Sequence, residues 1–307
     1  MRPVFRSRGD AMSDVDEERR LMKAPPAGLW SQGWGRFRRN RFGMTGALII
    51  LALYLAAVLA PLLTPYDPIA QGDVPKMRYV APCATHPLGT DKFGRDVLAR
   101  VIYGARISLM IALLAVAITV VLGALVGAVA GYFGGAVDAI LMRVVDALLA
   151  IPRLFLLLTC VALFSGSVWL IIVLLGATGW MDTARLVRAQ VLSLRNLDYV
   201  KAAEALGAGG RGVIWRHLIP NTMTVIIVAA TLRIGGIILT EASLSFLGLG
   251  VPPPTPSWGQ MVFEGREVLL SAWWLSTFPG VAIAVTVIGF NLLGDALKDA
   301  FDPRQFV

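Results

Sequence analysis

Charged residues are scarce in this chain, and their scarcity excludes an ordinary soluble domain. They make up 16% of the 307 residues, whereas hydrophobic residues make up 56% and the mean hydropathy is +0.69. Soluble domains carry about 25% charged residues. The apolar residues fall into long blocks almost free of charge, and a membrane-spanning helix needs about 20 such residues. The composition therefore predicts an all-α integral membrane protein.

Cysteine and histidine are nearly absent, which excludes several kinds of site. The two cysteines, Cys83 in a polar stretch and Cys160 in an apolar block, cannot build a disulfide framework or a metal cluster. The two histidines, His86 and His217, are far apart in the sequence. No grouping of nucleophile, base and carboxylate is present. We therefore expect no metal, no cofactor and no catalytic residue, and we predict that the chain is not an enzyme.

The sequence also lacks a phosphate-binding loop of the form G-x-x-x-x-G-K-[ST]. Gly207, Gly209 and Gly212 fit the dinucleotide pattern G-x-G-x-x-G, but an alanine-rich segment rather than a strand precedes them. We expect no nucleotide site there, so any ATP hydrolysis belongs to another chain.

Six apolar blocks are expected to span the membrane as helices. Pro152 is expected to bend the chain where the third block begins, because proline interrupts a helix. The blocks cover about 44–63, 107–130, 152–164, 168–181, 222–247 and 272–293.

The formal charge of +8 indicates topology rather than nucleic-acid binding, because the basic residues gather on particular segments. The segment up to Arg41 and the 182–217 loop are rich in arginine, whereas 248–270 has one arginine against two glutamates. Cytoplasmic loops carry the excess of Lys and Arg. Both termini and the 182–217 loop are therefore expected in the cytoplasm.

Two parts of the chain are expected, 1–43 and 44–307. Residues 1–27 have no apolar core of the signal-peptide kind and indicate a cytoplasmic tail. Residues 29–42 mix aromatic side chains with arginines, which suits a helix lying among lipid headgroups. A basic flank that anchors the first span explains the same pattern. The aromatic residues are Trp30, Trp34, Phe37 and Phe42.

Glycines recur at four-residue spacing in the second apolar block. Gly123, Gly127 and Gly131 share one helix face and leave a smooth stripe. Such stripes let another helix approach closely, so we expect these glycines in helix packing rather than in ligand contact.

The 199–220 segment has the composition of a docking loop. It predicts a short alanine-rich helix, a glycine turn at Gly207 and a second helix that leads into the membrane. A helix with small side chains that projects from a membrane protein is suited to insertion into a partner's groove.

The same segment resembles the EAA loop of binding-protein-dependent ABC importer permeases, which reads E-A-A-x-x-x-G, nine residues, then I-x-L-P. Here Ala202, Ala203, Gly207 and Pro220 keep the spacing. Lys201 replaces the acidic residue, and Glu204 supplies an acid one turn later. The sequence also departs from the family pattern at His217 and Ile219.

Other motifs extend the resemblance to the dipeptide/oligopeptide/nickel branch of that family and to its C-type subunit. They occupy the outer loops and the C-terminal end, and together the similarity covers roughly residue 36 onward. The motifs are His86-Pro87-Leu88-Gly89-Thr90-Asp91, Gly94-Arg95-Asp96, Leu244 to Gly250, Pro256-Ser257-Trp258-Gly259, Asn291 to Leu297, and Asp302-Pro303.

The resemblance implies a type I permease fold in a bacterial inner membrane and an ATP-driven machine. It implies a second permease subunit, two cytoplasmic ATP-binding subunits and an extracytoplasmic solute-binding protein. Ala202, Ala203, Glu204 and Gly207 would form the ATPase contact. Dipeptides or oligopeptides are the expected cargo, and nickel chelates, glutathione or other small solutes are the alternatives. A secondary carrier that needs no ATPase is a competing hypothesis, but it leaves the 202–220 pattern unexplained.

Arg233 and Glu241 lie inside the fifth block, where a charge costs about 2.5–3.5 kcal/mol. Eight residues apart, they are separated by about 80° around a helix and about 12 Å along it, which argues against a direct pair. These charges either line the translocation path or pair with polar groups inside the protein or on the partner permease. The structural role is favoured for Arg233, and both roles remain open for Glu241.

Residues of the outer loops also allow two interpretations. The charges of Asp91, Lys92, Arg95 and Asp96 either contact the binding protein or fold the loop through local salt bridges. Trp258 is expected to scaffold its loop. The pair Trp273-Trp274 is expected in the aromatic belt at the outer membrane surface.

Overall fold

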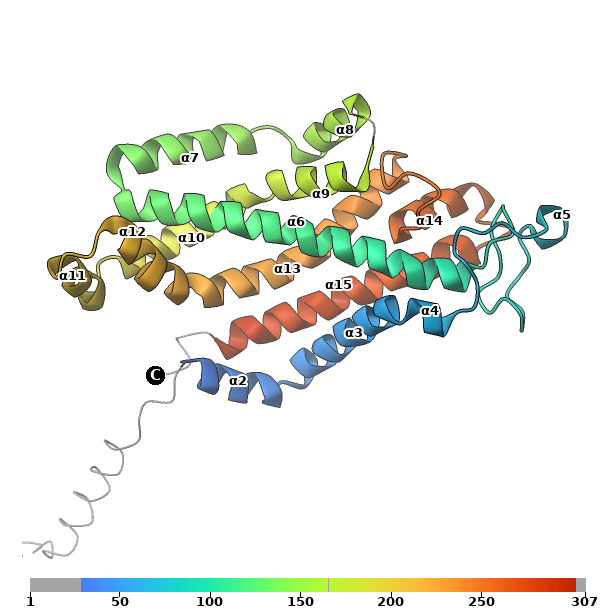
Figure 1. The fold of residues 1–307 in the computed structure, drawn as a ribbon, viewed down its shortest axis with the longest axis horizontal. Coiled ribbons are helices and arrows are strands. Elements are labelled where there is room, and N and C mark those ends of the chain that lie inside the picture. Colours follow the sequence, from blue (N-terminus) through green and yellow to red (C-terminus); the bar gives the residue numbers. More distant parts are fainter. Residues whose placement is uncertain (1–28, 165, 302–307) are drawn as a thin grey trace, which may run out of the picture.

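The computed structural model describes residues 29–164 and 166–301, and the expected tail at 1–27 lies outside these ranges. All regular secondary structure in the described ranges is helical. The long helices run roughly along one axis (Figure 1). The 198–213 segment lies at one end of the bundle, which we call the loop end, and the 258–265 segment lies near the other, which we call the far end.

Five helical segments are long and apolar enough to cross a membrane, and a sixth is formed if one bent pair counts as a single span. The predicted all-α membrane fold is therefore confirmed. The bend lies where Pro152 predicts it, since α7 and α8 differ in direction by 75°. The segments are α3 (Arg41–Val58), α6 (Val97–Phe133), the bent pair α7 (Gly135–Leu149) and α8 (Arg153–Leu163), α9–α10 (Val168–Ala177 and Trp180–Leu194), Gly210–Phe246, which ends in α13 (Ile219–Phe246), and α15 (Trp274–Ala300).

Several helices extend beyond the expected blocks, most of all α6 and α10. Helix α6 begins at Val97 rather than 107, capped by the Asp96 carboxylate, which accepts a hydrogen bond from the Ala99 amide at 2.7 Å. Helix α10 continues the fourth span to Leu194, so the expected 182–217 loop begins as a helix. The polar side chains of α10 that indicate a loop in the sequence form ion pairs with α7 and α13 instead.

The glycine stripe of α6 faces α10. A β-carbon on Gly123, Gly127 or Gly131 would come within 2.9 Å of α10 atoms. The two helices therefore touch backbone to backbone along this stripe. On the outer side of the pair, α7 is joined to α10 by ion pairs of Asp138 with Arg188 and of Asp146 with Arg185.

The main core lies where α6, α9, α13 and α15 meet, and it is built mainly of branched aliphatic side chains. Its largest fully buried members are Trp258 and the aliphatic residues Leu109, Ile111, Leu157, Ile171, Ile172, Leu175, Ile237, Ile238 and Leu244.

Helix α2 (Leu29–Arg39) packs along the C-terminal end of α15. Phe37 is 4% exposed against Ala296 and Ala300, whereas Trp34 and Phe42 are exposed, so the aromatic residues do not share one role. Trp274 also departs from the expected aromatic belt. It is buried and donates a hydrogen bond from Nε1 to the Thr90 carbonyl at 3.2 Å.

Candidate coupling loop and membrane-embedded charges

The coupling loop, residues 199–220, begins in α11 (Asp198–Ala205), a helix that ends on a glycine with a left-handed backbone. The Gly207 amide bonds to the Glu204 carbonyl at 2.9 Å, and the Ala208 amide bonds to the Ala203 carbonyl at 3.0 Å. This pair of bonds is a Schellman motif, whose C′ residue needs positive φ. Gly207 has φ +87°, so the predicted glycine turn is present and has a backbone cause.

Small side chains of α11 point away from the bundle. Ala202, Glu204 and Gly207 are exposed and Ala203 is half-buried. Leu206 stands at the tip with 89% of its surface exposed. Val200 is fully buried against the bundle and fixes the opposite face of the helix. The arrangement presents a small-sided helix and one apolar side chain to a partner.

The coupling loop is anchored to the last turn of α6. Tyr132 donates a hydrogen bond to Glu204 Oε1 at 2.9 Å, and Gly210 lies against the Tyr132 ring. Arg195 donates to the Gly131 carbonyl at 3.1 Å. Glu204 therefore has a partner within the chain. After this anchor the chain continues through α12 (Gly210–Val213) and a π-helical turn, Ile214–Leu218, into α13.

Arg233, in the middle of α13, contacts the break between α9 and α10. Its guanidinium donates to the Gly179 carbonyl and to Asp182 Oδ2, the latter at 2.5 Å. Arg153 reaches the same break from α8, donating to Thr178 Oγ1 and to the Leu175 carbonyl, both at 3.1 Å. The sequence reasoning missed Arg153 and Asp182, although a charge directly after a proline in an apolar block was an available signal.

Glu241 has different surroundings, as its spacing from Arg233 predicts. It is 1% exposed, and its Oε1 accepts hydrogen bonds from Ser245 at 2.9 Å and from Ser257 at 3.1 Å. Its Oε2 is buried without a hydrogen-bond partner in the described structure. Ser257 also caps α14 (Trp258–Gly265) by accepting from the Gln260 amide. Glu241 thus ties α13 to the start of α14.

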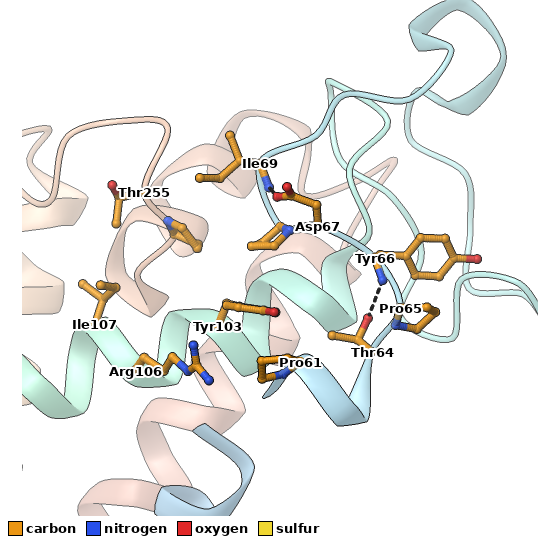
Figure 2. A pocket seen from close by; sticks show the side chains of 12 residues that line it. Pro61, Thr64, Pro65, Tyr66, Asp67, Ile69, Tyr103, Arg106, Ile107 and Thr255 are labelled. Atoms are coloured by element: carbon orange, nitrogen blue, oxygen red, sulfur yellow. Dashed lines mark hydrogen bonds between the residues drawn. The ribbon is translucent and has the colours of Figure 1, made fainter. Parts of the chain in front are cut away.

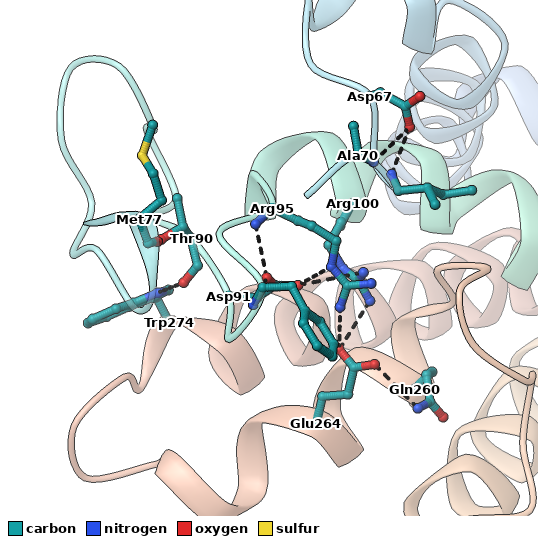
Figure 3. Close-up of polar contacts among 12 residues, drawn as sticks. Asp67, Ala70, Met77, Thr90, Asp91, Arg95, Arg100, Gln260, Glu264 and Trp274 are labelled. Atoms are coloured by element: carbon teal, nitrogen blue, oxygen red, sulfur yellow. Dashed lines mark hydrogen bonds and ion pairs between the residues drawn. The ribbon is translucent and has the colours of Figure 1, made fainter. Parts of the chain in front are cut away.

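A buried ionic cluster holds the far end together (Figure 3). Arg95 Nε lies 2.6 Å from Asp91 Oδ2, and Glu264 Oε2 receives Arg100 at 3.1 Å and Arg95 at 3.3 Å. His86 Nδ1 lies 2.8 Å from Asp96 Oδ2. These contacts assign the charges of Asp91, Arg95 and Asp96 to the folding of the loop, one of the two interpretations that the sequence allowed, whereas Lys92 is exposed. The expected scaffold role of Trp258 is also seen: it is 1% exposed and donates from Nε1 to the Val101 carbonyl.

An open cleft of 580 Å³ lies beside this cluster, between α6 and the loop that follows α4 (Ala60–Leu63) (Figure 2). Tyr103 and Arg106 of α6 lie on one side and Asp67 on the other. Arg106 is held by the carbonyls at the end of α3, including that of Val58 at 2.8 Å.

Comparison with known proteins decides the family. Residues 120–307 match the family described as binding-protein-dependent transport system inner membrane component. The chain belongs to that family. Residues 28–82 of this permease also match the N-terminal transmembrane domain of oligopeptide transport permease C.

Three curated relatives cover nearly the whole permease. It is 40% identical over 292 residues to the dipeptide transport system permease protein DppC of Bacillus subtilis (strain 168), which is 95% of this chain and 91% of the relative. It is 39% identical to the oligopeptide transport system permease protein OppC of the same organism, over 90% of both chains. It is 41% identical to the glutathione transport system permease protein GsiD of Escherichia coli O6:K15:H31 (strain 536 / UPEC), again over 90% of both.

The fold and the family together confirm the sequence prediction. The permease is a multi-pass protein of a bacterial inner membrane and the transport subunit of an ABC importer, a machine that also contains other subunits.

Proposed function

We propose that this permease imports dipeptides or oligopeptides as one of two membrane subunits that enclose the path, driven by ATP hydrolysis on separate chains. The main support for coupling between ATP hydrolysis and transport is α11, a helix with small side chains that projects from the bundle and ends on Gly207. The relatives named for dipeptide and oligopeptide transport support the cargo.

In this proposal Ala202, Ala203, Glu204 and Gly207 contact one of two ATP-binding subunits. The loop end and both termini then lie in the cytoplasm, as the arginine-rich segments favour. A solute-binding protein docks at the far end, which the buried ionic cluster keeps in one shape. In this proposal the catalysis of ATP hydrolysis belongs to the ATP-binding subunits.

Of the two charges considered for the translocation path, Arg233 is the better placed. Its side chain is 20% exposed and pairs with Asp182, whose side chain is 62% exposed. Glu241 is enclosed beneath Ser257, so in this conformation we assign it to holding α14.

Uptake by reconstituted vesicles tests the importer hypothesis. The permease with its second permease, ATP-binding subunits and binding protein should accumulate a labelled dipeptide only with ATP, and vanadate should stop uptake. The permease alone in the same vesicles is the control. Vanadate-insensitive uptake by the permease alone would refute the proposal and support a secondary carrier.

Glutathione is the second candidate cargo, because the glutathione permease relative is as similar as the peptide ones. Competition separates the two. If peptides are the cargo, unlabelled dipeptide reduces labelled dipeptide uptake at far lower concentration than glutathione does. The reverse order would assign the machine to glutathione.

A further inference from the structure

Two helix breaks lie side by side halfway along the spanning helices. The α7–α8 break at 150–152 and the α9–α10 break at 178–179 are joined by the hydrogen bond from Arg153 to Thr178. Arg233, which also reaches the second break, lies midway along the 28-residue α13. Non-helical backbone at membrane depth occurs only where protein covers it or where it lines a water-filled cavity.

The charges at these breaks do not balance. Arg233 pairs with Asp182 at 2.5 Å, but Arg153 donates only to a hydroxyl and a carbonyl. Within the described ranges no carboxylate lies within ion-pair distance of Arg153, although it is within electrostatic range of both Arg233 and Asp182. Two guanidinium groups therefore lie near a single carboxylate, which forms an ion pair with Arg233 alone. Ionisable groups inside the membrane normally pair or mark a substrate pathway.

The surface that continues from Arg233 along α13 is mixed: small and polar positions lie beside the side chain of Leu239, which is 48% exposed. Gly236 has open space around it, and Thr240 and Ser243 lie on the same helix face. Their hydroxyls donate to carbonyls of their own helix at 2.7 and 2.8 Å, which leaves lone pairs available. The polar positions of this face, with Asp182 62% exposed beside them, favour contact with water over contact with lipid. This face suits an aqueous path.

We propose that Arg153 and Arg233 form a binding site for the terminal carboxylate of the transported peptide. The inference rests on the proposed function. A guanidinium binds a carboxylate through parallel hydrogen bonds, and Arg153 provides the charge that no residue neutralises. The ion pair with Asp182 already satisfies part of the Arg233 guanidinium, so Arg233 binds the peptide carboxylate only weakly and can release it.

The test compares a dipeptide with its C-terminal amide. The assembled transporter is reconstituted in vesicles with saturating binding protein, and initial uptake of alanyl-alanine and of alanyl-alanine amide is measured. The same binding protein delivers both compounds to every variant. Its own preference for acid or amide therefore cancels when the uptake ratios of two variants are compared. Arg153→Gln should reduce the acid-to-amide uptake ratio about tenfold, as loss of a charge-assisted hydrogen bond predicts. Arg153→Lys, which keeps the charge but not the parallel hydrogen bonds, should give a ratio between those of the wild type and Arg153→Gln.

Arg185→Gln is the matched control, because Arg185 pairs with Asp146 on the outside of α10 and should leave the ratio unchanged. An Arg153→Gln protein that loses acid and amide uptake equally, with intact ATP hydrolysis, would overturn the site, since Arg153 would then only hold the α9–α10 break. An unchanged ratio would overturn it too. Failure of the wild-type transporter to import either compound would instead overturn the peptide function on which the site rests.

Discussion

Gly207 offers the sharpest test of the coupling loop. The methyl group added by Gly207→Ala changes the backbone preference at this position without meeting a neighbouring atom. At φ +87° a β-carbon costs about 1–2 kcal/mol, and no other atom lies within 4 Å to add to that cost. This penalty lowers the ratio of capped to frayed α11 about 5- to 30-fold. If the capped helix is the form that binds the ATPase subunit, Gly207→Ala weakens coupling by up to the same factor.

Gly209→Ala is the matched control for this perturbation. It adds the same methyl group two residues away, in equally open space, at φ −66°. Gly207→Asn should lie between wild type and Gly207→Ala, because asparagine tolerates the left-handed region better than alanine does. A bulky residue at Gly207 should separate ATP hydrolysis from uptake altogether.

The assay measures ATP hydrolysis and dipeptide uptake in the same reconstituted vesicles. The expected result is a lower number of peptides imported per ATP hydrolysed in Gly207→Ala and an unchanged number in Gly209→Ala. Equal behaviour of the two alanine variants would show that the left-handed turn has no part in coupling.

Three further predictions concern stability and accessibility. Glu264→Gln leaves two buried arginines short of a carboxylate and should cost about 3 kcal/mol, measured by thermal unfolding in detergent, whereas Asp73→Asn breaks an exposed pair and should cost less than about 1 kcal/mol. Gly127→Val places carbon atoms inside the α6–α10 contact and should lower stability by about 1–3 kcal/mol in the same assay; an unchanged melting temperature would refute the close packing. The hydrogen bond with the Thr85 hydroxyl holds the pKa of the exposed Cys83 thiol below its usual value. Thr85→Ala should raise that pKa, so Cys83 of the variant should react more slowly than that of the wild type with an impermeant maleimide added outside the cell at neutral pH. At a pH above the thiol pKa of both proteins the two rates should be equal. No reaction from outside would contradict the proposed orientation.

Periodicity and hydropathy predicted most of the fold because the bilayer demands long apolar helices. They also predicted the bend at Pro152, where the cause is local. They failed at α10, whose Asp182, Arg185 and Arg188 read as a polar loop. Each of these side chains meets its partner from another helix, and that information is absent from the local sequence.

The functional sites, like the helices, were predictable where their cause is local and not where distant residues meet. The turn at Gly207 follows from local composition, and it is present. The cluster around Glu264 joins residues more than 160 positions apart in the chain, so no spacing rule predicts it. Arg153 and Asp182 were missed for a related reason, because their importance comes from two helix breaks that become neighbours only in the folded bundle.

Helix α10 links the two regions in which function is proposed. Asp182 lies in its first turn and the coupling loop follows its last, about 18 Å away along the helix axis. The glycine contact with α6 removes the side chains that would otherwise absorb a small sliding or rotation between the two helices. We propose that a push on α11 is transmitted along α10 to Asp182 and changes its distance from Arg233. Nucleotide-driven movement at one end of the machine would then alter how strongly its centre holds a negative charge.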